Sequence, residues 1–127
     1  MIDTARWRLA LAGLNGLMAV AAGAFGAHGV SDPQVKDWLR TGAQYQLVHA
    51  VAGLACFSLL RASVGPAAWA GWLFGLGGLL FGGSLYLLAL TGTRLLGAVT
   101  PIGGVLLMLG WAALIWGAIG LAAAPKA

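Results

Sequence analysis

The chain has 127 residues, of which 61% are hydrophobic and 8% are charged, and its formal net charge is +4. Soluble domains are about 45–50% apolar and about 25% charged, so this composition excludes an ordinary soluble protein and is typical of a membrane protein. The seven basic residues are scattered along the chain and form no continuous stripe, which argues against nucleic acid as a partner.

The charged residues leave four uncharged runs, each long enough for one membrane crossing. A helix needs about 20 mainly apolar residues to cross a hydrocarbon core of about 30 Å. Barrel strands would alternate polar and apolar residues, and these runs do not, so we predict an all-α integral membrane protein. It is expected to be a single membrane domain, residues 1–127, built as a bundle of four transmembrane helices. The predicted spans are approximately 7–27, 44–60, 67–90 and 101–121.

A second helix is predicted to begin before the second span enters the membrane. Asp32 is expected to cap this helix, and Pro33 to open it. Val35, Trp38 and Leu39 then share one helical face, as in a short interfacial helix that lies in the headgroup region and leads into the second span. The alternative is that this segment is simply an extended end of the second span.

Turn signals also separate the later spans. Pro66 is suited to the opening turn of the third span, and residues 91–94 are expected to end it. Thr100 and Pro101 repeat the cap-and-opening pattern, which leaves residues 95–99 as a short apolar loop near the interface. Four crossings then place both termini on one side of the membrane.

The basic residues favour a cytoplasmic location for that side. Arg6 and Arg8 immediately precede the first span, which usually dominates orientation, and cytoplasmic segments carry an excess of Lys and Arg. The bias over the whole chain is weak. The terminal side carries Arg6, Arg8, Arg61 and Lys126, against Lys36, Arg40 and Arg94 on the other side.

Small residues recur along three spans and predict close helix packing. Lipid tails are as apolar as leucine, so helices in a bilayer associate through close backbone contact at small residues. Some of these strips could equally face another subunit, so a homo-oligomer or a larger membrane complex is a possible assembly. The strips comprise Gly16, Ala19 and Gly23, then Gly71, Gly75, Gly78 and Gly82, and finally Gly103, Gly110 and Gly117.

Polar side chains gather toward the side opposite the termini. His49 is expected to lie inside the second span with Tyr45 one turn away on the same face, and ionisable residues within a membrane are functional candidates by default. An alternative is that His49 is neutral and joins two helices by hydrogen bonds. This candidate polar cluster consists of His28, Gln44, Tyr45, Gln46, His49, Ser84, Tyr86 and Thr100.

The leading hypothesis is a non-enzymatic protein that binds a small molecule, lipid or partner at this cluster, and as an oligomer forms a transport route. An accessory subunit of a larger membrane complex is one alternative. Another is an embedded enzyme or cofactor binder that uses His28 and His49, or a hydrolase that pairs Ser84 with His49. Two histidines without nearby carboxylates or thiolates make a poor metal site, so we expect no metal and no cofactor. The chain contains no glutamate, and its aspartates lie outside the spans, which argues against carboxylate-based proton or sodium coupling.

Four short segments together resemble a known family. They are Gly-Ala-Phe-Gly-Ala-His-Gly at 23–29, Gln-Tyr-Gln at 44–46 followed by His49, Leu-Phe-Gly-Gly-Ser-Leu-Tyr at 80–86 and Thr-Pro-Ile-Gly-Gly at 100–104. Their order is similar to that in the membrane proteins catalogued as domain of unknown function 423, which have vertebrate relatives of the transmembrane protein 256 type. The resemblance implies a bacterial inner-membrane protein of four spans, and it implies that the candidate polar cluster coincides with the family's motif residues.

Overall fold

The protein folds into four long helices in a computed structural model that describes residues 2–60 and 65–123. The predicted all-α fold is confirmed. Arg61 and Lys126, two of the four basic residues expected on the side of the termini, lie outside the described residues. The helices are α1 (Ile2–His28), α2 (Pro33–Leu60), α3 (Ala67–Thr91) and α4 (Thr100–Ala123), with a short 3₁₀ helix, η1 (Arg94–Ala98), before the last.

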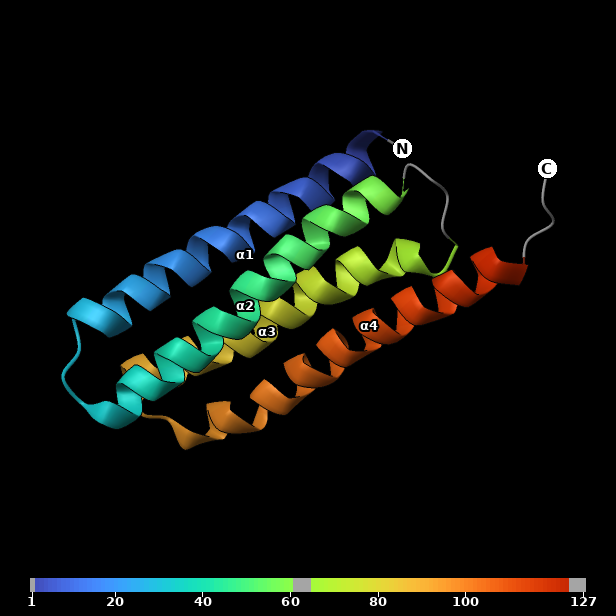
Figure 1. Cartoon of the computed structure of the whole chain (residues 1–127). Helices are drawn as coiled ribbons and strands as arrows, with labels where there is room; N and C mark the ends of the chain where they lie inside the picture. The colour runs from blue at the N-terminus through green and yellow to red at the C-terminus, as the bar shows by residue number, and fades with distance from the viewer. Residues whose placement is uncertain (1, 61–64, 124–127) are drawn as a thin grey trace.

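The helices run up and down, and each packs along the next in sequence (Figure 1). The α1–α2 turn and the α3–α4 connection lie at one end of the bundle, opposite the end where α1 begins and α4 finishes. α1 also contacts α3, whereas α4 makes few or no close backbone contacts with α1 and α2 among the described residues. α4 is therefore held to the bundle mainly through α3.

Three stretches are long and apolar enough to cross a membrane: Ala5–His28, Ala68–Thr91 and Arg94–Gly120. α2 carries more polar residues, but it has 28 residues and packs between α1 and α3, so it occupies the same depth and crosses with them. The predicted bundle of four transmembrane helices is confirmed. The limits of each span within the bilayer stay predictions.

The start of α2 follows the expected chemistry. The Asp32 carboxylate accepts the backbone N–H groups of Gln34 at 2.8 Å and Val35 at 3.2 Å, and Pro33 is the first helical residue. The helix then continues without a break to Leu60. The short interfacial helix is therefore the first part of α2 and no separate element, as the alternative interpretation predicts.

The connection from α3 to α4 is partly as predicted. α3 ends at Thr91 because Gly92 adopts a left-handed φ of +70° and its N–H closes on the Leu88 carbonyl at 2.8 Å. Residues 95–99 were expected to be a loop, and this prediction is wrong for most of them. The chain satisfies its amides there through local bonds, such as Val99 N–H to the Leu96 carbonyl at 3.0 Å, and so forms η1.

The small residues lie where helices approach one another. On α1, Gly16 and Gly23 face Ala50 and Ala43 of α2, and Ala19 is buried. On α4, Gly103 lies against the backbone of Phe81, Gly110 against the Phe74 ring, and Gly117 is buried. The α3 strip faces α1 and α2: a Cβ on Gly71, Gly75, Gly78 or Gly82 would meet Cys56, Leu11, Asn15 or Gln46, respectively.

The orientation of the bundle leads to a first prediction. A reporter that fluoresces only in the cytoplasm should be bright when fused after the last residue, Ala127, because Arg6 and Arg8 favour a cytoplasmic N-terminus and four crossings return the chain to the same side. The matched control is the same reporter fused after Ser31, in the α1–α2 turn, which should be dark. The reverse pattern would show that the termini are extracytoplasmic.

Candidate functional site

A chain of buried hydrogen bonds joins α1, α2 and α3 at the centre of the bundle. The Gln46 amide nitrogen donates to Asn15 Oδ1 at 2.9 Å, and its oxygen accepts the Tyr86 hydroxyl at 2.7 Å. Asn15 in turn donates to the carbonyl of Gly75 at 3.1 Å and to that of Leu11 at 2.9 Å. Gln46 is 0% exposed and Asn15 is 1% exposed, so the two amides of this network are closed to the surroundings of the bundle, whereas Tyr86 is partly buried.

Two glycines of α3 make room for the amides of this network. A Cβ on Gly78 would lie 2.6 Å from Asn15 Oδ1, and a Cβ on Gly82 would lie 2.9 Å from Gln46 Oε1. The glycine strip therefore does more than bring backbones together, because it admits polar groups between them. Both amides use donors and acceptors within the network, so a ligand would enter only by breaking it.

A second polar contact ties α3 to α4. The Ser84 hydroxyl donates to the Phe81 carbonyl at 3.1 Å and lies 2.6 Å from the Thr100 hydroxyl. Because Ser84 has one proton and uses it on Phe81, Thr100 is the donor of the shorter bond. The hydroxyl of Thr100 thus binds the neighbouring helix.

His49 forms the third polar contact, between α2 and α4. Trp111 Nε1–H donates to His49 Nε2 at 3.0 Å, and His49 Nδ1 lies 2.6 Å from the Tyr45 carbonyl oxygen. An indole N–H can only donate, so His49 Nε2 accepts and the ring proton sits on Nδ1, which donates to Tyr45. One donor and one acceptor are the partners that a neutral imidazole requires.

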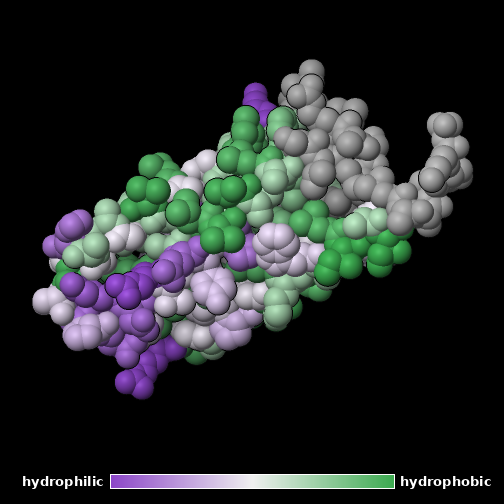
Figure 2. Space-filling model, viewed as in Figure 1, coloured by the Kyte–Doolittle hydropathy of each residue, from purple (hydrophilic) through white to green (hydrophobic). Residues whose placement is uncertain are grey.

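The contact between His49 and Trp111 bridges two helices that scarcely touch through their backbones, and we call this place the α2–α4 seam. The buried Phe74 ring forms its floor, with its centroid 5.5 Å from that of His49 and 4.8 Å from that of Trp111. Trp111 is 44% exposed and Tyr45 is 50% exposed, whereas His49 is 7% exposed. Figure 2 shows hydrophilic colour extending from one end of the bundle into its otherwise apolar middle.

Comparison with known proteins identifies the family. The family model described as "Protein of unknown function (DUF423)" matches residues 22–104. The chain belongs to the DUF423 family. A relative named UPF0382 inner membrane protein YgdD, from Escherichia coli, is 43% identical over 93% of this chain and 93% of its own length. Two other relatives are named UPF0382 membrane proteins. The one from Staphylococcus epidermidis is 46% identical over 83% of this chain and 88% of its own length. The one from Bacillus subtilis is 40% identical over 86% of this chain and 93% of its own length. No solved structure matches.

This DUF423 protein is therefore a multi-pass protein of the bacterial inner membrane, and the resemblance found in the sequence is confirmed. All four motif segments lie within the matched stretch, residues 22–104. The family description assigns no activity, so the site must be judged from its geometry.

The DUF423 fold divides the candidate polar cluster among separate places. Gln46 and Tyr86 enter the central network, Ser84 meets Thr100, and Tyr45 and His49 line the seam. His28 and Gln44 are exposed and join none of these contacts.

The geometry does not bring the two histidines together. His28 ends α1, whereas His49 is next to Ala50, which faces Gly16. His49 therefore lies beside position 17 of α1, eleven residues before His28. At 1.5 Å per residue the two histidines are about 17 Å apart along the helix axis, which is too far for both to bind one metal or haem iron. Among the described residues no group of three metal-ligating side chains occurs. The Ser84 hydroxyl is engaged by Phe81 and Thr100, so the Ser84–His49 pair of a hydrolase is not formed.

Two residues of the site were missed by the sequence analysis, and both lie outside the segment that the family model matches. Asn15 stands alone in an apolar run, and an amide at that depth signals a partner on another helix. Trp111 stands about three turns inside the fourth span, away from the interfacial belt where tryptophan is common. A buried or half-buried indole N–H usually finds an acceptor, which was the available signal.

Proposed function

We propose that this DUF423 protein is a non-enzymatic membrane protein that binds a small lipid-soluble molecule at the α2–α4 seam. The observation that supports this proposal is the hydrogen bond from Trp111 to His49 Nε2. The Trp111 side chain covers this acceptor nitrogen and is itself 44% exposed, so a ligand can reach the acceptor by displacing the indole. A ligand with a hydroxyl or amine donor takes the place of the indole N–H. The ligand's donor keeps His49 Nε2 hydrogen-bonded after the exchange, and the cost of the exchange is the indole N–H of Trp111, which loses this acceptor.

The surroundings of His49 suit an amphipathic ligand. The apolar Phe74 ring offers a flat floor, and the Tyr45 ring lies parallel to that of His49 with a centroid distance of 6.4 Å. α4 is attached mainly through α3, so the Trp111 side chain can swing without separating α2 from α3. The bond from Nδ1 to the Tyr45 carbonyl keeps the imidazole in one tautomer while Nε2 changes partners.

The same geometry supports binding over catalysis. Ser84, the candidate nucleophile that the sequence pairs with His49, has its hydroxyl committed to Phe81 and Thr100. Asp32 and Asp37 lie at the beginning of α2, about three turns or more before His49, so neither carboxylate supports the imidazole as a general base.

Native mass spectrometry of the protein released from its own membranes in a mild detergent tests the proposal. We expect an added small mass on the wild type, its loss in His49→Phe, and about threefold better retention in Trp111→Phe on dilution. The two variants should act in opposite directions, because the first removes the acceptor and the second removes its competitor.

The matched control is Trp116→Phe, which changes another exposed tryptophan of α4. It should retain the added mass as the wild type does. Bare protein from all four samples, or equal behaviour of the two tryptophan variants, would contradict the proposal. An added mass equal to another protein chain would instead favour the accessory-subunit hypothesis, with the half-exposed rings of the seam as its docking place.

A further inference from the structure

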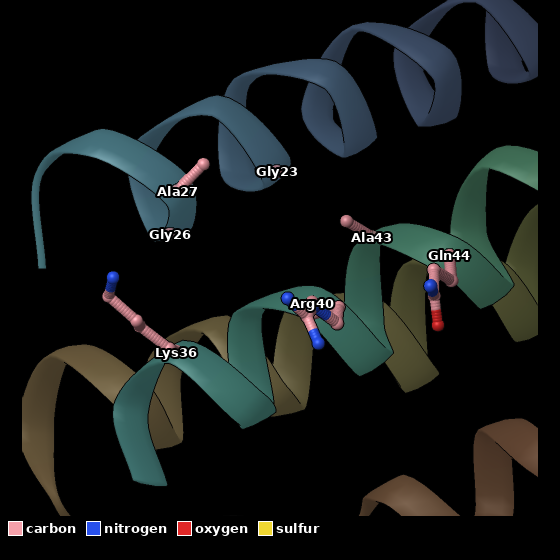
Figure 3. A pocket seen from close by; sticks show the side chains of 7 residues that line it. All are labelled: Gly23, Gly26, Ala27, Lys36, Arg40, Ala43 and Gln44. Carbon is pink, nitrogen blue, oxygen red and sulfur yellow. The ribbon is translucent and has the colours of Figure 1, made fainter. Parts of the chain in front are cut away.

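A hollow opens between α1 and α2, away from the seam, at the end of the bundle that carries the turns. It has a volume of ≈ 320 Å³, and Figure 3 shows it between the last turns of α1 and the first half of α2. Its apolar wall consists of the small residues Gly23, Gly26, Ala27 and Ala43. The absence of large side chains on both helices is what leaves this space open.

The polar side of the hollow is basic. Lys36, Arg40 and Gln44 line it, and none of the described lining residues is acidic. All three residues are exposed, and Figure 3 shows Lys36 reaching from α2 toward the end of α1. Two cations beside small apolar residues, at the end of a transmembrane bundle, are suited to bind an amphipathic anion, whose charged group contacts the cations and whose apolar part contacts the small residues.

We propose that this hollow, which we call the basic pocket, binds the phosphate headgroup of an anionic phospholipid. The three polar residues recur every four positions, so they form a ladder along one face of α2 with steps of about 6 Å. Lys36 and Arg40 hold the phosphate at the outer steps, where Arg also offers parallel N–H donors. Gln44, one turn further into the membrane, donates to an ester carbonyl of the lipid, and the first acyl carbons lie along the glycines of α1.

The depth of the ladder distinguishes a lipid from free phosphate. A free anion would use the two cations at the outer steps and leave Gln44 and the small-residue wall without a role. A phospholipid engages the whole length of the pocket, because its phosphate, ester groups and acyl chains follow one another toward the bilayer centre. This inference does not rest on the function proposed for the seam, since the two sites share no residue.

The test measures binding of phosphatidylglycerol to the full-length protein in phosphatidylcholine nanodiscs. The double variant Lys36→Gln, Arg40→Gln should weaken binding roughly thirtyfold. Each basic residue near an anionic headgroup contributes a factor of about five, and the two factors multiply. Ala27→Trp fills the pocket without changing charge and should also weaken binding. His49→Phe, which changes the seam, should bind phosphatidylglycerol as the wild type does, so the two proposals fail separately.

Matched controls separate the pocket from its surroundings. Arg94→Gln removes a positive charge at the same end of the bundle outside the pocket, and Ala21→Trp places the same indole at another exposed position of α1. Both should leave binding unchanged. Equal weakening by Arg94→Gln would overturn the proposal in favour of a diffuse surface charge. Displacement of the lipid by inorganic phosphate, with normal binding by Ala27→Trp and Gln44→Leu, would overturn it in favour of a free-anion site.

Discussion

Replacing Gln46 by alanine should destabilise the protein by about 2–4 kcal/mol. The substitution removes a side chain that is 0% exposed and leaves a cavity. It also leaves Asn15 Oδ1 without its amide donor and the Tyr86 hydroxyl without its acceptor. Water is scarce at this depth, so the stranded groups find no replacement partner, and the loss exceeds that of a single hydrogen bond.

The measurement is the free energy of unfolding in a mild detergent titrated with a denaturing one. Gln44→Ala is the matched control, since it makes the same chemical change at an exposed position on the same helix and should shift stability by less than about 0.5 kcal/mol. A double-mutant cycle with Asn15→Ala should show coupling, because each single change already breaks the shared bond. Equal losses at Gln44 and Gln46 would show that the network is not the source of the effect.

These two glutamines also show where sequence reasoning reaches its limit. Charge segregation and run length predict four helices, because those features depend only on the bilayer. The fates of Gln44 and Gln46 depend on how α2 is rotated about its axis. In a soluble helix an apolar stripe would reveal that rotation, but in lipid the outward face is as apolar as the inward one. Leu17 is 70% exposed and Phe74 is 0% exposed, and nothing in the two residue types distinguishes them.

The candidate site was predictable only in part for the same reason. His49 and Tyr45 are placed one turn apart by helical periodicity, and the structure keeps their rings parallel. The partner that matters most, Trp111, lies 62 positions away along the chain, and local spacing carries no information about that pairing. The eight polar residues of the candidate polar cluster all lie toward one side of the membrane, and this shared depth is why they were predicted to form one cluster. Depth is readable from sequence, whereas the side of the helix is not.

Among substitutions that add a single methyl group, Gly103→Ala is expected to cause the largest loss of stability, because it should push α4 away from α3. A Cβ at this position would meet the backbone nitrogen and Cα of Phe81 and would lie 2.9 Å from the carbonyl oxygen of Gly77. Backbone atoms of a packed helix cannot turn aside as a flexible side chain does, so the helices must move apart. Overpacking typically costs about 1–3 kcal/mol, and we expect the upper end of that range.

Gly104→Ala is the control for this prediction, because its Cβ would meet only the Phe81 ring, at an ordinary contact distance of 3.8 Å. Its stability should stay within about 0.5 kcal/mol of the wild type.

Since α4 carries both Trp111 and Thr100, displacing it in Gly103→Ala should also weaken the contacts to His49 and Ser84. Tryptophan fluorescence, measured with the other tryptophans replaced by phenylalanine, should report a changed Trp111 environment in Gly103→Ala and not in Gly104→Ala. Identical spectra and stabilities for the two variants would mean that α3 and α4 do not pack as closely as the structure shows.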